Sequence, residues 1–199
     1  MPTVPPPLGR RERNKLDKLD RITSAARELF TEHGVDEVTT QQIADKADVA
    51  VGTLFLYAKT KSELLLLVQN SAYADALTRG TAAAESITDE LDAVMAIVRP
   101  VVECNRTQID NGRTYLREIV FGDPAEPHHH TALSHTIDTE KAIAAVLTRD
   151  ARTDPRTAAT RAHIVSAIMF VTMAASINRA SSVADLLDQI RDQIRVVLP

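Results

Sequence analysis

The sequence has little of several residue types: its 199 positions include no tryptophan, one cysteine, six glycines, three tyrosines and four phenylalanines. A single cysteine, Cys104, excludes an internal disulfide, which agrees with a reducing compartment and favours a small core residue over a nucleophile. No run approaches the ~20 apolar residues that span a bilayer, and residues 1–9 lack the apolar stretch of a signal peptide. These absences predict a cytoplasmic protein that does not associate with a membrane.

The interior must therefore be built from aliphatic side chains. Hydrophobic residues make up 44% of the chain, which is enough for a core of Leu, Ile, Val and Ala. They recur mostly at helical spacing, as expected for helices that bury one face. The pattern predicts an all-α fold of about nine helices.

Positive charge is concentrated at one end, although the net charge is −4. Residues 1–61 carry ten Lys and Arg against nine Asp and Glu, whereas residues 62–199 carry thirteen against eighteen. Six basic residues precede or enter the first predicted helix, residues 14–33: Arg10, Arg11, Arg13, Lys15, Lys18 and Arg21. They are consistent either with an arm that reaches phosphates or a minor groove, or with a solvated terminus.

Residues 38–65 indicate two short helices joined by a tight turn, the layout of a helix-turn-helix DNA reader. Thr39 or Thr40 can cap the first helix, and the second is expected to begin after Val49. The second helix then presents a short, neutral surface with hydroxyl groups, through residues 50–57. Such a surface suits a groove lined by phosphates and base edges.

The segment around residues 127–135 contains four histidines: His128, His129, His130 and His135. Adjacent histidines cannot easily point at one ion, and no cysteine or carboxylate pair completes a tetrahedral set, so we expect an exposed loop without a metal site. The sequence leaves metal binding open, and clustered imidazoles that titrate near neutrality would also make this loop sensitive to pH.

Two other segments carry structural predictions. Pro100 lies within a helical pattern over residues 91–102, where it should kink the helix because it removes a backbone donor.

Near the C-terminus, the apolar segment 163–177 and the amphipathic segment 182–197 predict an antiparallel helix pair that leaves apolar surface uncovered. Two copies would form a four-helix bundle. The predicted dimer interface is Ile164, Ile168, Val171, Leu186, Leu187, Ile190 and Ile194.

Several short motifs at fixed offsets occur in the first third of the chain. They are residues 25–30 (Ala-Ala-Arg-Glu-Leu-Phe), 33–35 (His-Gly-Val), 38–40 (Val-Thr-Thr), 43–44 (Ile-Ala), Val49, 52–54 (Gly-Thr-Leu), Tyr57 and 61–65 (Lys-Ser-Glu-Leu-Leu). In this combination the sequence resembles the tetracycline-repressor (TetR) family. The remainder has no motif, but its helix count and final apolar helices look like that family's ligand-binding and dimerisation domain.

The resemblance implies DNA-contact roles for the matching positions. Phosphate contacts are expected from Thr40, Thr53, Tyr57 and Lys61, and contacts to base edges from Gln41, Val51, Gly52 and Phe55. The sequence departs from the family at Phe55, where relatives often have Tyr, and at Ala58, where they often have an aromatic residue. Phe55 can touch a thymine methyl but cannot donate a hydrogen bond to phosphate. Each residue has a purely structural alternative, such as an N-cap for Thr40 or packing for Tyr57.

The resemblance also implies a domain order: a flexible arm over residues 1–12, a three-helix DNA-binding domain over 13–60, and a helical ligand-binding and dimerisation domain over 61–199. Such proteins are typically homodimeric repressors that a small molecule releases from a palindromic operator in double-stranded DNA. Candidate pocket residues are Met95, Val98, Val102, Tyr115, Ile119, Met169 and Met173, with Arg113, Asn105 or Gln108 as polar anchors. Ordinary core packing is the alternative for every one of them, and no cofactor is expected.

Two rival functions remain at this point. An enzyme would need a converging nucleophile, metal or acid and base pair, and the sequence offers none. A DNA-binding activator or architectural protein that senses no small molecule would have the same motifs as a repressor.

Overall fold

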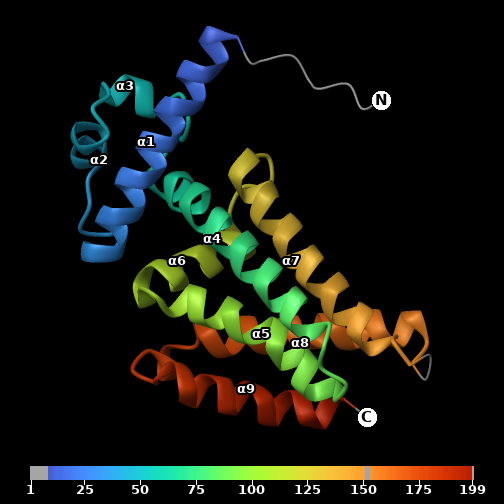
Figure 1. The fold of residues 1–199 in the computed structure, drawn as a ribbon. Coiled ribbons are helices and arrows are strands. Elements are labelled where there is room, and N and C mark those ends of the chain that lie inside the picture. Colours follow the sequence, from blue (N-terminus) through green and yellow to red (C-terminus); the bar gives the residue numbers. More distant parts are fainter. Residues whose placement is uncertain (1–8, 151–152, 199) are drawn as a thin grey trace, which may run out of the picture. The chain divides into compact units, whose positions relative to one another are not determined.

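The computed structural model describes residues 9–150 and 153–198, and every regular element within those ranges is a helix (Figure 1). This confirms the all-α prediction. The elements are α1 (Arg10–His33), α2 (Thr40–Lys46), α3 (Val51–Leu54), α4 (Lys61–Ala84), α5 (Glu90–Arg106), α6 (Ile109–Phe121), α7 (Pro127–Leu147), α8 (Pro155–Ala174), the short 3₁₀ helix η1 (Ser176–Asn178) and α9 (Val183–Val197). Most of the predicted arm, residues 1–8, lies outside the described residues, whereas residues 10–12 are already helical.

The chain divides into two compact units, of which one ends at Val68 and the other begins at Gln69. The division falls within α4, whereas the sequence prediction placed the domain boundary at residues 60 and 61. The run of leucines at the start of α4 explains this position. Leu64 and Leu65 are fully buried in the core of the first unit, so the first turns of α4 belong to it.

The core of the first unit forms around α1. The helix buries Ile22, Ala26 and Phe30, which recur at helical spacing on one face. Ile43 of α2 and Leu54 of α3 belong to the same buried cluster. Burying one large aliphatic or aromatic side chain contributes about 1.5–3 kcal/mol, so this cluster holds α2 and α3, which are too short to be stable alone.

In the second unit, α8 packs against both α7 and α9, and α5 packs against α6, α7 and α9. The helix α5 continues through Pro100, which leaves the carbonyl of Ala96 without its usual helical donor. Gly80 of α4 lies against this point, where a Cβ would be 2.9 Å from the Ala96 carbonyl oxygen and from the Ile97 Cα. Glycine therefore allows α4 to pass close beside the proline-containing part of α5.

The histidine-rich segment is helical, so the prediction of an exposed loop is wrong. Helix α7 begins at Pro127, because proline fits the first turn, where no amide donor is needed. His129 is consequently buried, and its Nε2 lies 3.2 Å from the Ile119 carbonyl oxygen. Within the described residues, no group of three or more His, Cys, Asp and Glu side chains is arranged to hold a metal ion.

Candidate nucleic-acid interface

The N-terminus of α2 is fixed by a reciprocal cap. The Thr39 hydroxyl accepts a hydrogen bond from the Gln42 amide at 3.2 Å, and the Thr39 amide donates to Gln42 Oε1 at 2.8 Å. Thr39 is therefore the capping residue, and Thr40 occupies the first helical position with its side chain outside this cap. The alternative that Thr40 serves only as an N-cap is wrong.

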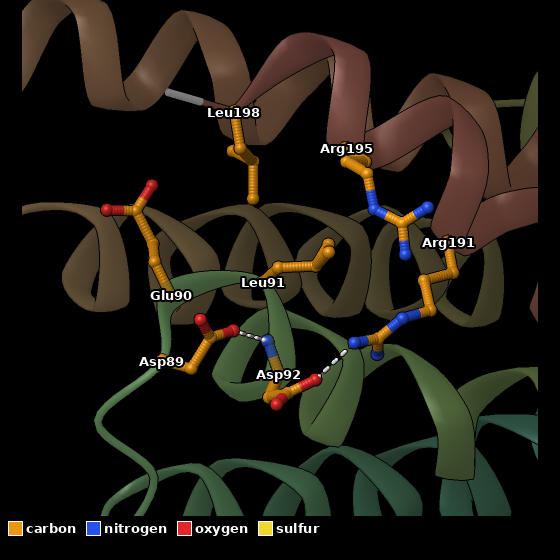
Figure 2. A pocket seen from close by; sticks show the side chains of 7 residues that line it. All are labelled: Asp89, Glu90, Leu91, Asp92, Arg191, Arg195 and Leu198. Atoms are coloured by element: carbon orange, nitrogen blue, oxygen red, sulfur yellow. Dashed lines mark hydrogen bonds and ion pairs between the residues drawn. The ribbon is translucent and has the colours of Figure 1, made fainter.

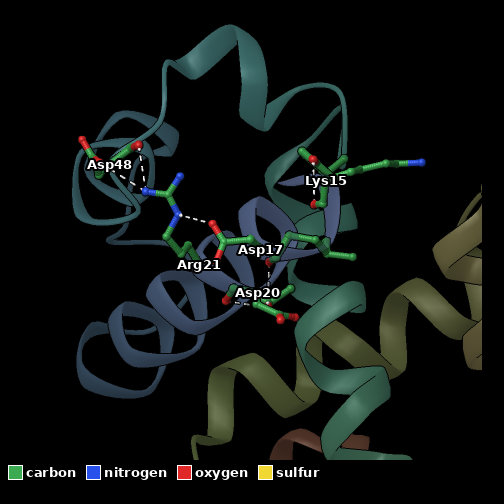
Figure 3. Close-up of polar contacts among 8 residues, drawn as sticks. Lys15, Asp17, Asp20, Arg21 and Asp48 are labelled. Atoms are coloured by element: carbon green, nitrogen blue, oxygen red, sulfur yellow. Dashed lines mark hydrogen bonds and ion pairs between the residues drawn. The ribbon is translucent and has the colours of Figure 1, made fainter. Parts of the chain in front are cut away.

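The turn between α2 and α3 is braced from α1. Asp48 lies in this turn and adopts a positive φ of 50°, an uncommon conformation for a residue with a Cβ. Arg21 reaches this turn and donates from Nη1 to the Asp48 carbonyl oxygen at 3.3 Å and to Oδ2 at 3.2 Å (Figure 3). Asp17 pairs with the same guanidinium at 3.7 Å. Arg21 thus orients the turn within the first unit.

The reading helix α3 has only four residues and begins after Ala50, so it is shorter than the predicted segment 50–57. Phe55 is 43% exposed. Gly52 is exposed, and a Cβ at this position would meet no atom within 4 Å. Val51 and Tyr57 are half-buried and pack partly against the core. The backbone at Gly52 is therefore open to an approaching ligand.

The remaining predicted contact residues also keep accessible surface. Lys61 is half-buried and donates from Nζ to the Asp36 carbonyl oxygen at 3.1 Å, while exposed Gln41 donates to Asp45 Oδ1 at 2.7 Å. Thr53 is half-buried. None of the eight predicted DNA-contact residues is buried, so all of them have surface available for a partner.

The sequence analysis did not predict the hydrogen bonds that cap the N-terminus of α4. The Thr60 hydroxyl accepts from the Glu63 amide at 3.1 Å, and the Glu63 carboxylate accepts from the Lys59 amide at 2.8 Å. The sequence Thr60-Lys61-Ser62-Glu63 carries the signature of a capping box, which would have identified this arrangement. The cap places Lys61 in the first turn of α4.

An open groove of about 780 Å³ also lies within the first unit. Its lining joins the first turns of α1 to the segment after α3: Arg11, Glu12, Asn14, Lys15, Lys18, Leu56 and Tyr57. The Tyr57 hydroxyl donates to the Lys15 carbonyl oxygen at 3.1 Å and thereby links the two sides of the groove.

The seven predicted pocket residues of the second unit are all buried, with exposed fractions of 6% or less. Among them Tyr115 belongs to a polar network: its hydroxyl donates to Asn70 Oδ1 at 2.9 Å, and Asn70 donates to the His128 carbonyl oxygen at 2.9 Å. Burial raises the pKa of Tyr115 well above its usual value and raises that of Tyr73 to about 12. The three polar anchors suggested by sequence instead serve the fold: Arg113 and Asn105 donate to backbone carbonyls, and Gln108 caps α6.

A hollow of about 330 Å³ lies elsewhere in this unit, between the start of α5 and the end of α9 (Figure 2). Asp92 and Arg191 form an ion pair across it, and Asp89 caps α5 by accepting from the Asp92 amide at 2.8 Å. Its lining contains none of the seven predicted pocket residues.

The predicted interface residues fall into two groups. Leu186, Leu187, Ile190 and Ile194 are at most 3% exposed, because α9 turns its apolar stripe toward the chain's own core. They have no surface left for a second copy, which corrects their assignment to a dimer interface. Ile164, Ile168 and Val171 of α8 retain surface, with Val171 at 69%.

Helix α8 is also the one described helix with the length and mean hydropathy of a membrane span. Buried core helices share these properties, and α8 packs against α7 and α9.

Comparison with known proteins matches the first unit to a family. Residues 22–68 match the family described as bacterial regulatory proteins, tetR family. An uncharacterized HTH-type transcriptional regulator of Haemophilus influenzae is 39% identical over 51 residues, a stretch that covers 26% of this chain and 27% of that protein. The chain thus spans only about a quarter of the length of this relative.

Solved structures share the fold over nearly the whole chain. A TetR transcriptional regulator from Rhodococcus sp. RHA1 has a TM-score of 0.71 at 18% identity, covering 93% of this chain and 97% of that one. FadR of Thermus thermophilus, a TetR-family transcriptional repressor solved in complex with lauroyl-CoA, has a TM-score of 0.67 at 23% identity, with 89% and 92% covered. The matched segment ends at Val68, where the first compact unit also ends. Residues 22–68 thus match the tetR family, and the chain as a whole shares its fold with solved TetR regulators.

Proposed function

We propose that this protein is a homodimeric repressor that binds a palindromic operator and is released from it by a small molecule. The observation that carries the DNA-binding part is the open backbone at Gly52, flanked by exposed Gln41 and Phe55 on a capped and braced helix-turn-helix. Thr40, Thr53, Tyr57 and Lys61 would hold phosphates beside it, since hydroxyls and amines are common phosphate partners.

The dimer rests on the surface of α8. Ile164, Ile168 and Val171 are spaced by four and three residues and therefore lie on one face of the helix. This face keeps apolar surface exposed in the single chain, and a second copy related by two-fold symmetry would bury it. Two readers would then meet half-sites about 34–36 Å apart, or a multiple of one helical turn.

The effector part rests on a group of buried polar side chains in the second unit. The second unit holds a buried polar network, Asn70, Tyr73, Tyr115 and Thr139, inside an otherwise apolar interior. Polar groups fixed in apolar surroundings are typical of small-molecule sites. The similar Thermus protein is named with an acyl-CoA, so acyl thioesters are the first compounds to test here. We expect the protein to act in the cytoplasm, where its operator would lie.

Selection of bound duplexes from a random library tests the DNA-binding part. The proposal predicts an enriched inverted repeat, and a Gln41→Ala variant should select an altered half-site while Lys141→Ala, in the second unit, should select the same one. A protein that enriches no sequence over the input library is not an operator-binding repressor. Compounds are then screened for release of the selected duplex, and an activator or architectural protein would show no such release.

A further inference from the structure

The groove between α1 and the segment after α3 contains one residue of the DNA contacts proposed above, Tyr57. Three of its lining residues are basic, namely Arg11, Lys15 and Lys18. They are four and three residues apart, so they lie on one face of α1. All three are exposed, and the Lys15 side chain extends away from the helix (Figure 3).

The charges of this face are not used inside the protein. Within residues 9–150 and 153–198, no carboxylate lies within ion-pair distance of Lys15 or Lys18. Arg21, one turn further along α1, differs from them because Asp17 and Asp48 already pair with it. Glu12 is the one acidic residue of the lining, against three basic ones. The groove therefore keeps an excess of positive charge available to an anionic partner.

The opposite wall of the groove has a different character. Leu56 is 82% exposed, and Tyr57 presents a half-buried ring whose hydroxyl is bound to the Lys15 carbonyl oxygen. A strand of DNA offers matching surfaces, since anionic phosphates alternate with deoxyribose groups that have apolar faces. Cationic side chains on one wall and an apolar side chain on the other thus fit a sugar-phosphate strand.

The position of the groove in the first unit also favours a DNA strand as its partner. Leu56 and Tyr57 follow α3 directly in the chain, and the major groove that a reading helix enters is bordered by a phosphate strand on each side. In the proposed complex, residues immediately after that helix would lie near one of these strands. A groove continuous with Tyr57 would extend the contact along the strand.

We propose that Arg11, Lys15 and Lys18, with Leu56 and Tyr57, bind the sugar-phosphate backbone of duplex DNA next to the half-site. This inference rests on the proposed DNA-binding function and adds a second contact surface to it. The contact reads no bases. It strengthens binding to every duplex that the protein engages, and it makes that binding more sensitive to salt.

The test compares the double variant Lys15→Ala/Lys18→Ala with wild type on a selected duplex and on one with a changed half-site. Each phosphate contact contributes about 0.9 to the slope of log affinity against log salt. The slope should fall by about 1.8, while the ratio of affinities for the two duplexes stays the same. A charge-matched control, Arg99→Ala/Lys141→Ala in the second unit, should keep the wild-type slope.

An unchanged slope in the double variant overturns the inference, as does an equal loss in the control, which would indicate a general effect of net charge. A changed ratio between the two duplexes would show that the lysines read bases and would also overturn it. If wild type itself shows no preference between the duplexes, the proposed function fails instead. Circular dichroism of each variant checks that these exposed substitutions leave the helices intact.

Discussion

Substitution of Gly52 should lower the affinity for DNA without lowering the stability of the protein. A Cβ there meets nothing in the protein, and replacing a helical glycine by alanine stabilises a helix by up to about 1 kcal/mol. We expect Gly52→Ala to melt at the same temperature as wild type or higher. Its affinity for the selected duplex should nevertheless fall roughly tenfold, because a contact worth about 1–3 kcal/mol is disturbed.

Calorimetry and fluorescence anisotropy on the same preparation measure both quantities. Gly9→Ala is the matched control, since a Cβ at Gly9 also meets no atom and this residue precedes α1. Unchanged affinity in Gly52→Ala would mean that the backbone of α3 does not approach DNA closely.

Ionisation of Tyr73, in the buried polar network, should make the free energy of unfolding depend on pH. The Thr139 hydroxyl donates to the His135 carbonyl oxygen at 2.8 Å, so Tyr73 is the donor in its 3.0 Å hydrogen bond with Thr139. Burial, the largest cause, raises the pKa of Tyr73 from 10.0 to about 12. Between these values the unfolded chain loses this proton while the folded protein keeps it, so the free energy of unfolding falls as pH rises.

We expect Tyr73→Phe to cost about 1 kcal/mol at neutral pH through the lost hydrogen bond. Between pH 10 and 12, however, the variant should lose less stability than wild type, because phenylalanine has no proton to release. Urea unfolding at pH 8, 10 and 11.5 measures the difference. Parallel losses in the two proteins across this range would show that Tyr73 is not protected from ionisation.

At the scale of elements, the crossing of α4 and α5 depends on Gly80. A Cβ would meet backbone atoms of Ala96 and Ile97 at 2.9 Å, and backbone cannot move aside as a flexible side chain can. We expect Gly80→Ala to lower the free energy of unfolding by about 1–3 kcal/mol, the usual cost of overpacking. Thermal melting measures it, with Gly52→Ala as the contrasting helical glycine. A melting temperature equal to wild type would show that the two helices separate easily.

The exposed face of α8 gives a prediction about assembly. Val171 is 69% exposed on the stripe that a second copy would cover, and a carboxylate there would be buried without a partner. Val171→Glu should therefore sediment as a monomer at concentrations where wild type is a dimer. Val120→Glu is the control, because Val120 is 60% exposed on a different helix, α6, and we expect this variant to remain dimeric. A dimeric Val171→Glu protein would rule out α8 as the interface.

The sequence predicted the positions of the helices better than it predicted what their apolar faces pack against. Helical periodicity located α1, α5 and α9 because each buries a stripe of aliphatic side chains, and a continuous apolar segment located α8. It placed His129 in a loop, since the tripled histidines hid a helix start that Pro127 makes favourable. Periodicity identifies an apolar face but not its partner. For this reason Leu187 and Ile190 were assigned to a second copy, although they pack inside the chain.

Local motifs predicted the residues of the candidate site, but they did not predict the tertiary contacts that hold these residues in place. Accessible surface at Gln41, Gly52 and Phe55 agrees with the roles that the family resemblance implies. The brace from Arg21 to the turn at Asp48 joins residues 27 positions apart, and only tertiary structure brings them together. The groove beside α1 likewise needs both α1 and the segment after α3, although its basic residues were evident in the sequence.

For the whole molecule, we propose that the first unit reads DNA and that the more acidic second unit supplies pairing and a response to ligand. Residues 62–199 carry five more acidic than basic residues, so electrostatic attraction to DNA must come mainly from the first unit. In the proposed dimer each chain would supply one reader, and specific binding would require two. Loss of pairing should weaken binding to the full operator without changing which half-site is read.

Sedimentation of the protein on a labelled duplex that carries one selected inverted repeat tests this central claim most directly. We predict two chains per duplex at saturation, and a sharp loss of affinity when one half-site is scrambled. A single chain bound per duplex, with the same affinity for the intact and the half-scrambled site, would contradict the account.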